Sequence, residues 1–162
     1  MQVALGKTNE YDRAKGILNR GKHPTFIGKT MVQRNALQGG LLFCIVDGKD
    51  AAAALVNVRN STLLVLNVLP EFRSRGVGAR FLSFIRPNFA RVVSFAVPWF
   101  ERQGYVAIGE PKQGRKLATQ IMARKELFSL AGRVSKAFAE GCRCDAITAA
   151  GQATLLVKPP SE

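Results

Sequence analysis

The fold is decided by the stretch Val68-Leu69-Pro70-Glu71-Phe72-Arg73-Ser74-Arg75-Gly76-Val77-Gly78-Ala79-Arg80-Phe81-Leu82. It follows an apolar run that predicts a buried strand, and it leads into apolar residues at helical spacing. Gly76 and Gly78 lack a Cβ atom, so the backbone between strand and helix can turn sharply and approach a ligand closely. N–H groups at the start of a helix have no intrahelical acceptor and attract anions. The stretch therefore predicts a loop that binds a pyrophosphate.

Three arginines add positive charge to this predicted anion site: Arg73, Arg75 and Arg80. The glycine spacing alone is weak support, because two glycines close together often arise by chance. No Gly-Lys-Ser/Thr sequence follows, which excludes a Walker P-loop, and the missing third glycine argues against a dinucleotide fingerprint. On the loop alone, a tight strand–helix turn without a ligand stays open as the alternative.

Apolar patterns before the loop predict helices and strands. One helix is expected from an N-cap at Asn9 to a stop at Gly21, and a second over about 29–38. Three strands are expected at 41–46, 51–58 and 62–69, and their short connections, one of them Asp47-Gly48, indicate an antiparallel meander. In the third strand, the run from Leu63 to Leu69 is apolar on both faces except for Asn67, which suits a central strand covered on both sides.

The second half of the chain is predicted to continue with helices and strands. A helix follows the loop, with an apolar face of Val77, Phe81, Leu82, Ile85 and Phe89. Later elements are a strand at 91–97, a short helix at 98–103, strands at 105–108 and 117–123, a helix at 127–138 and a last strand at 154–157. This order predicts one α/β (α+β) domain with a mixed, mostly antiparallel central sheet and helices on both faces.

Two stretches resemble a known family. The stretch from Val68 to Leu82 resembles the acetyl-CoA motif of the GNAT N-acetyltransferases, in which Val-x-Pro and an aromatic residue precede Arg/Gln-x-x-Gly-x-Gly. Further along, Ala96-Val97-Pro98-Trp99-Phe100-Glu101-Arg102-Gln103-Gly104-Tyr105 resembles the second family motif, a short helix that ends in glycine and an aromatic residue. The resemblance implies a GNAT domain over residues 1–126, with 127–162 as a C-terminal extension packed on it.

The resemblance also implies a reaction, acyl transfer from acetyl-CoA to an amine acceptor whose identity stays open. Backbone groups of Leu66, Asn67 and Val68 would hold the acyl and pantetheine part of the cofactor. The pyrophosphate would be held by amides and side chains of the loop, namely Arg73, Ser74, Arg75, Gly76, Val77, Gly78, Ala79 and Arg80. The attacking amine must lose a proton and the thiolate must gain one, which calls for a base or water relay and an acid.

One position departs from the family pattern. The family's general acid is a tyrosine four residues before the motif glycine, and here that residue is Phe100, which cannot donate a proton. Asn67 and Ser94 are candidates for ordering a water, and His23 is a candidate base because histidine titrates near neutral pH. For each of these three residues, a structural or surface role is the alternative. The resemblance therefore assigns a cofactor loop without assigning the acid.

Charge is the strongest signal in the composition. The 162 residues include 24 Lys and Arg against 11 Asp and Glu, a formal net charge of +13. Such an excess favours anionic partners, among them nucleic acid. Basic residues dominate 112–136, namely Lys112, Arg115, Lys116, Arg124, Lys125, Arg133 and Lys136.

Phage Mom DNA-modifying enzymes and tRNA-directed toxins belong to the wider GNAT superfamily, although Phe100 replaces the tyrosine that the toxins use. The resemblance therefore admits a second reading, a GNAT-fold module with altered or lost acetyl transfer that binds or modifies nucleic acid, or docks to a protein. A solvated basic surface is the alternative explanation of the charge.

The remaining sequence features exclude other classes of protein. Zinc sites take about four Cys- or His-type ligands, and the chain has three cysteines (Cys44, Cys142 and Cys144) and one histidine, so no metal site is expected. Cys44 lies in an apolar run and is expected in the core. No apolar run reaches the roughly 18 residues of a membrane span. The N-terminus lacks signal-peptide features, so a cytoplasmic protein without a membrane role, monomeric or homodimeric, is expected.

Overall fold

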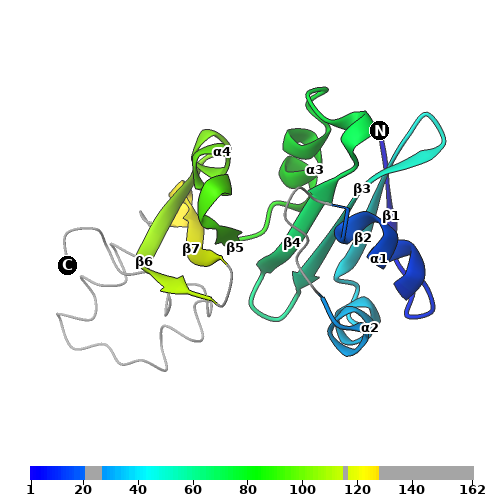
Figure 1. The fold of residues 1–162 in the computed structure, drawn as a ribbon, viewed down its shortest axis with the longest axis horizontal. Helices are drawn as coiled ribbons and strands as arrows, with labels where there is room; N and C mark the ends of the chain where they lie inside the picture. Colours follow the sequence, from blue (N-terminus) through cyan, green and yellow to red (C-terminus); the bar gives the residue numbers. More distant parts are fainter. Residues whose placement is uncertain (21–26, 115–116, 128–162) are drawn as a thin grey trace. The chain divides into compact units, whose positions relative to one another are not determined.

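The computed structural model describes residues 1–20, 27–114 and 117–127. Contacts divide the chain into two compact units, Met1–Pro87 and Asn88–Glu162 (Figure 1). Of the second unit, 88–114 and 117–127 are described. Within each unit, every strand pairing that the structure describes is antiparallel.

In the part of the first unit that the structure describes, four strands pair in the order β1-β2-β3-β4. They are β1 (Gln2–Leu5), β2 (Leu41–Val46), β3 (Lys49–Asn57) and β4 (Thr62–Val68). β2 and β3 are joined by Asp47-Gly48, where both residues have positive φ, 53° and 75°. Positive φ at both central residues is the geometry of a two-residue hairpin turn, which explains why the Asp-Gly pair predicts this turn correctly.

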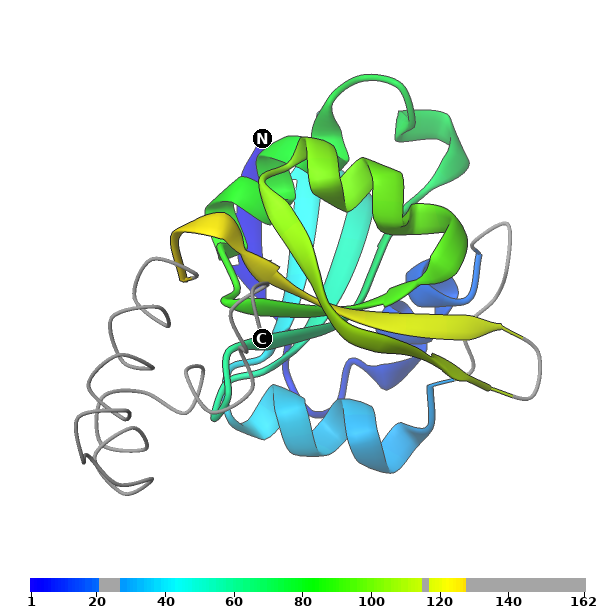
Figure 2. The same cartoon turned by 90° about the vertical axis from the view of Figure 1, so that its left-hand side faces the viewer.

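Helices cover both faces of these four strands. α1 (Tyr11–Leu18) and α2 (Lys29–Leu37) lie on one face, and α3 (Val77–Ile85) lies on the other (Figure 2). Between them, the alanines at 51–54 of β3 are completely buried. Small side chains on both faces of β3 let the helices pack closely, and they explain why this strand shows no alternation of polar and apolar residues.

β4 contains one irregular residue. Leu55 of β3 is opposite Val65, whereas the next residue of β3, Val56, is opposite Leu63. Leu64 is therefore an extra residue on β4, which makes a β-bulge. A bulge bends its strand and changes the face to which the neighbouring side chains point.

The described residues of the second unit contain three strands that pair in the order β5-β7-β6. They are β5 (Phe89–Val93), β6 (Tyr105–Gln113) and β7 (Ala118–Arg124). Between β5 and β6 the chain forms a short 3-10 helix, η2 (Ser94–Ala96), and then α4 (Val97–Arg102). Phe89, Ile108 and Ala123 form a small buried core, against which Ile121 and Leu127 pack.

The predicted α+β class with mostly antiparallel strands is confirmed, and the predicted elements up to the loop lie within about two residues of the observed ones, except that the first helix ends at Leu18 rather than at Gly21. Some details were wrong. Glu10, not Asn9, is the N-cap of α1. Phe89 does not belong to a helix: α3 ends at Ile85, Arg86 takes a left-handed φ of 48°, and Phe89 opens β5.

Two other differences concern the strands. β1 was not predicted from the sequence, and residues 94–96, which were predicted to continue the strand after Pro87, form η2. The helix predicted at 127–138, apart from Leu127, and the strand predicted at 154–157 lie outside the described residues. The division into a domain at 1–126 and an extension at 127–162 therefore stays a prediction.

Candidate functional site

The loop between β4 and α3 begins with one turn of 3-10 helix, η1 (Pro70–Phe72), and ends at Gly76, the N-cap of α3. Gly76 has a φ of +73°. This left-handed conformation costs other L-residues about 1–2 kcal/mol. A Cβ atom at Gly76 would meet no heavy atom within 4 Å. The space beside the start of α3 is therefore open, and a ligand can approach its backbone closely.

The start of α3 lacks the groups that usually satisfy a helix N-terminus. No side chain caps it, and its first turn contains no acidic residue. The helical ladder begins with the N–H of Arg80, which donates to the Gly76 carbonyl at 3.1 Å. The N–H groups immediately before Arg80 therefore have no intrahelical acceptor, and the helix dipole adds partial positive charge there. This arrangement fits an oxyanion such as a phosphate.

Buried apolar side chains fix the loop while its polar groups face solvent. Phe72 and Val77 are buried. The exposed residues between and beyond them are Arg73, Ser74, Arg75, Gly76 and Arg80. The loop residues expected to hold the pyrophosphate therefore lie together on one short, anchored segment, as the sequence motif requires.

Two arginines of the loop, Arg73 and Arg75, make different contacts. Arg73 donates from Nε to the Val68 carbonyl at 3.0 Å and from Nη2 to the Arg20 carbonyl at 3.5 Å. Arg75 lies over the Phe72 ring, with Cζ 5.3 Å from the ring centroid. Its Nη2 is also 3.7 Å from the Asp47 carboxylate. Arg73 thus closes the loop onto the end of β4 and onto α1, a structural role that the sequence did not indicate.

The β4 residues expected to face the acyl and pantetheine part are half-buried. Asn67 and Val68 are opposite Ala53 and Ala52 of β3. The side-chain amide of Asn67 donates to the Ile17 carbonyl at 2.7 Å. Its Nδ2 therefore joins β4 to α1, and the role of Asn67 in ordering a water stays a prediction.

The second unit holds the other motif residues. Ser94 Oγ donates to the Ala118 carbonyl at 3.0 Å, which ties η2 to β7. Phe100 is buried, and its ring meets Trp99 and Tyr105 edge-on at centroid distances of 4.9 Å and 5.8 Å. Tyr105 is buried in the same aromatic group. His23 lies outside the described residues.

The described part of the chain offers few groups for other chemistry. It contains no cluster of three or more His, Cys, Asp or Glu side chains that could hold a metal ion. Cys44 is completely buried, and burial raises the pKa of its thiol, so it is a core residue as expected. Of the helices in the described residues, none is long and apolar enough to cross a membrane.

Sequence reasoning missed two features of the first unit. Arg20, two residues beyond the end of α1, forms a 3.7 Å ion pair with Glu71 of η1, which also links the segment after α1 to the loop. A cavity lies between α2 and the adjoining ends of β3 and β4. Polar residues at helical spacing along α2 and its C-cap, such as Arg34 and Gln38, could have indicated this cavity from the sequence.

Solved structures with the same fold show which proteins this chain resembles. Arabidopsis thaliana Naa50, in complex with the bisubstrate analogue CoA-Ac-MVNAL, is 12% identical, with 76% of this chain and 97% of that chain covered and a TM-score of 0.61. The Escherichia coli ribosomal-protein-S18-alanine N-acetyltransferase is 17% identical over 76% and 92% of the two chains, with a TM-score of 0.54.

A third similar structure is the Drosophila melanogaster polyamine N-acetyltransferase, which forms N-acetylagmatine. It is 12% identical over 75% of this chain and 97% of that chain, with a TM-score of 0.55. No protein-family model matches the chain. No curated protein matches its sequence either.

Proposed function

We propose that this chain, which has the fold of the GNAT acetyltransferases, is an acetyl-CoA-dependent N-acyltransferase that acts on an amine. The observation that carries the proposal is the uncapped start of α3, where Gly76 takes positive φ beside open space. The loop motif, the shared fold and the CoA analogue bound by Naa50 support the same cofactor.

In this proposal, the start of α3, the loop before it and the end of β4 bind different parts of the cofactor. Acetyl-CoA, when bound, would supply a thioester whose carbonyl an amine can attack, with CoA leaving as the thiolate. The N–H groups at the start of α3 bind the pyrophosphate, and Arg75 and Arg80 offset its charge. Arg73 contributes mainly by holding the loop against Val68. Backbone groups of Leu66, Asn67 and Val68 orient the acyl and pantetheine part.

Proton transfer in the proposed reaction does not use a tyrosine at the second motif. Phe100 has no ionisable proton, and its ring is packed against Trp99 and Tyr105. We infer that water carries the protons that the motif tyrosine transfers in other members of the family. In this proposal, Asn67 and Ser94 order the water and His23 acts as a base. A slow reaction is expected, because a positioned general acid contributes roughly 100-fold or more to a rate.

The test is an assay of CoA thiol release from acetyl-CoA with a panel of amines. The panel contains a polyamine and a peptide with a free N-terminus, because one structural neighbour is a polyamine N-acetyltransferase and another binds the bisubstrate analogue CoA-Ac-MVNAL. Amine-dependent thiol release and an acetylated product identified by mass spectrometry are expected. If acetyl-CoA binds but no amine is acetylated, the chain is a cofactor-binding module rather than an enzyme.

Nucleic acid is a second candidate partner, supported by the net charge of +13. Of the basic residues at 112–136, Lys112, Arg124 and Lys125 are described, and Arg124 already donates to the Asn88 side chain. Binding through the remaining charges would weaken steeply as salt rises. Binding of a short duplex or RNA that does not weaken between low and physiological salt would contradict this reading, as would no binding at low salt.

A further inference from the structure

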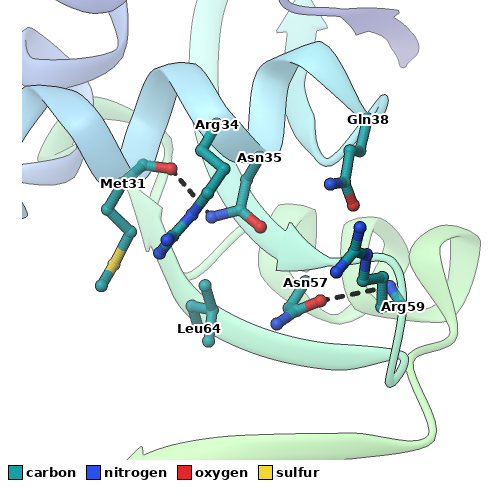
Figure 3. A pocket seen from close by; sticks show the side chains of 7 residues that line it. All are labelled: Met31, Arg34, Asn35, Gln38, Asn57, Arg59 and Leu64. Carbon is teal, nitrogen blue, oxygen red and sulfur yellow. Dashed lines mark hydrogen bonds between the residues drawn. The ribbon is translucent and has the colours of Figure 1, made fainter.

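The cavity of the first unit has a volume of about 320 Å³ and lies between α2 and the ends of β3 and β4 (Figure 3). Its lining contains two guanidinium groups, three side-chain amides and two apolar side chains. These belong to Met31, Arg34, Asn35, Gln38, Asn57, Arg59 and Leu64. No acidic side chain lines it. A cavity with this lining is electropositive and rich in hydrogen-bond donors.

One face of α2 forms the first wall. Its lining residues are at positions 31, 34, 35 and 38, the i, i+3, i+4, i+7 spacing of one helical stripe. Val32 and Ala36 point into the core instead. Figure 3 shows Arg34 and Asn35 projecting from α2 toward the strand ends that carry Leu64 and Asn57. α2 thus has a polar stripe beside its buried one.

The bulge in β4 places Leu64 in the second wall. In a regular strand, residues three apart such as Leu64 and Asn67 point to opposite faces. Here Leu64 lines a cavity with α2, and Asn67 bonds to α1 on that same face of the strands (Figure 2). The extra residue therefore turns Leu64 toward the cavity.

The amides of the cavity are partly fixed by local hydrogen bonds. Asn35 is buried and donates from Nδ2 to the Met31 carbonyl at 2.8 Å, which orients its side chain. Asn57 Oδ1 accepts the N–H of Arg59 at 3.1 Å, so Nδ2 of Asn57 remains as its donor. Among the ion pairs of the described residues, none involves Arg34 or Arg59. Two guanidinium groups that form no ion pair among the described residues therefore line the same cavity as the side-chain amides of Asn57 and Gln38.

We infer that this cavity binds an oxyanion group, a carboxylate or a phosphate, carried by the amine acceptor. Arginine offers a planar pair of donors that matches both groups, and the amides of Asn57 and Gln38 supply further donors. The assignment of an amine as the acceptor rests on the proposed function. The binding of an oxyanion group does not rest on it, because it is argued from the cavity itself. It makes the acceptor a small zwitterion or phosphorylated amine rather than a simple cationic amine.

The place of the cavity along β4 is consistent with this assignment. Leu64 lies near the start of β4, whereas Val68 at its end leads into the phosphate loop. The four residue steps from Leu64 to Val68 span about 13 Å of strand. A cofactor held by its pyrophosphate at the loop and extended along β4 would thus direct its acyl end toward the part of the strand where the cavity lies.

The test follows the side-chain Nε–Hε NMR signals of Arg34 and Arg59 in the full chain. These signals are assigned from Arg34→Gln and Arg59→Gln, and CoA is present throughout to occupy the loop. Inorganic phosphate, acetate, phosphoethanolamine, β-alanine and ethanolamine are added separately at constant ionic strength. A short single-stranded RNA is the macromolecular probe.

Phosphate or acetate should change the chemical shifts of both arginine signals in a saturable way, with one shared midpoint. The amine that carries the same phosphate or carboxylate group should do the same. Ethanolamine should not move these signals. Each Gln substitution should weaken binding about tenfold or more, because it removes a charged hydrogen-bond donor. Arg34→Lys, which keeps the charge but loses the planar fork, should weaken binding less than Arg34→Gln.

Arg102→Gln on α4 is the control, because Arg102 is exposed and its removal changes the net charge equally. It should leave the midpoint unchanged. Weak, unsaturable movement of all arginine signals would overturn the inference. So would RNA binding that depends on Arg34 and Arg59 while the small anions have no effect. A separate titration of CoA reports on the loop, so failure at the cavity is distinguishable from failure of the cofactor proposal.

Discussion

The side-chain amide of Asn67 donates a 2.7 Å hydrogen bond to the backbone carbonyl of Ile17, fifty residues earlier in the chain. The same carbonyl also accepts the N–H of Arg20 at 3.3 Å. The bond ties the sheet of the first unit to the last turn of α1, close to the end of β4 that leads into the loop before α3. Asn67, the polar side chain near the end of this mainly apolar strand, thus has a defined partner.

Replacing Asn67 by leucine should lower the free energy of unfolding by about 1–2 kcal/mol, because it removes a donor from a half-buried contact. Asn67→Asp should cost more, since a carboxylate would face a carbonyl oxygen. Urea denaturation checks both. Ser83→Ala, at an exposed position of α3, is the control and should change little. Equal stability of Asn67→Leu and the unaltered chain would show that the bond contributes nothing.

Gly76→Ala should separate backbone strain from ligand binding. Positive φ at Gly76 predicts a loss of about 1–2 kcal/mol in unfolding free energy, with no added clash because the space around it is open. The new methyl group would occupy space beside the proposed phosphate, so CoA affinity should fall at least about tenfold. Gly39→Ala is the matched control, since Gly39 has a φ of +79° and equally open surroundings.

Both alanine variants should lose similar stability in urea, and only Gly76→Ala should lose CoA affinity in a binding titration. If Gly39→Ala weakens CoA binding as much as Gly76→Ala does, the loss reflects general destabilisation, and the loop is not the phosphate site.

Glu10 should give the first unit a pH-dependent contribution to stability. Its carboxylate accepts the Lys7 N–H at 2.9 Å and an Arg13 guanidinium bond at 2.7 Å, and these bonds hold the pKa of Glu10 below its ordinary value of 4.5. A lowered folded-state pKa means that the carboxylate stabilises the fold above pH 4.5 and ceases to do so as the pH falls below it.

Glu10→Gln should therefore be less stable than the unaltered chain at neutral pH, by less than about 1 kcal/mol because the pair is partly exposed. The two free energies of unfolding, measured in urea at several pH values, should converge in acid. A difference that grows on acidification would refute the role assigned to the Glu10 carboxylate.

Phe100→Tyr restores the proton donor that the family motif contains. If the second motif lies where the resemblance implies, the turnover number should rise toward the roughly 100-fold that a general acid contributes. The buried hydroxyl should cost about 1–3 kcal/mol of stability where it finds no partner. Phe84→Tyr, at an exposed position of α3, is the control and should leave turnover unchanged. A stable Phe100→Tyr variant with unaltered turnover would remove Phe100 from the reacting centre.

Local sequence signals were enough to predict most of the elements. Leu41 to Val46 and Thr62 onward are strands because apolar β-formers lie between turn residues, and Asp47-Gly48 fixes the hairpin between the first two strands. The loop was predictable for the same reason, because glycine at a position of positive φ followed by an amphipathic helix is a local pattern.

Features that depend on distant partners could not be predicted in this way. The bulge at Leu64 is a property of the register with β3, and nothing in the β4 sequence marks it. Arg73 looked like a phosphate ligand by its position, yet its guanidinium reaches backbone carbonyls of Val68 and Arg20. The arginine cavity likewise depends on α2 and the β3–β4 turn, which only the tertiary structure brings together.

The central claim, that the loop before α3 binds coenzyme A, is tested most directly by calorimetric titration of the full chain with CoA. The loop geometry predicts saturable binding of one CoA per chain, unchanged in Gly39→Ala and at least about tenfold weaker in Gly76→Ala. The absence of saturable binding at millimolar CoA, or binding that Gly76→Ala leaves intact, would contradict it.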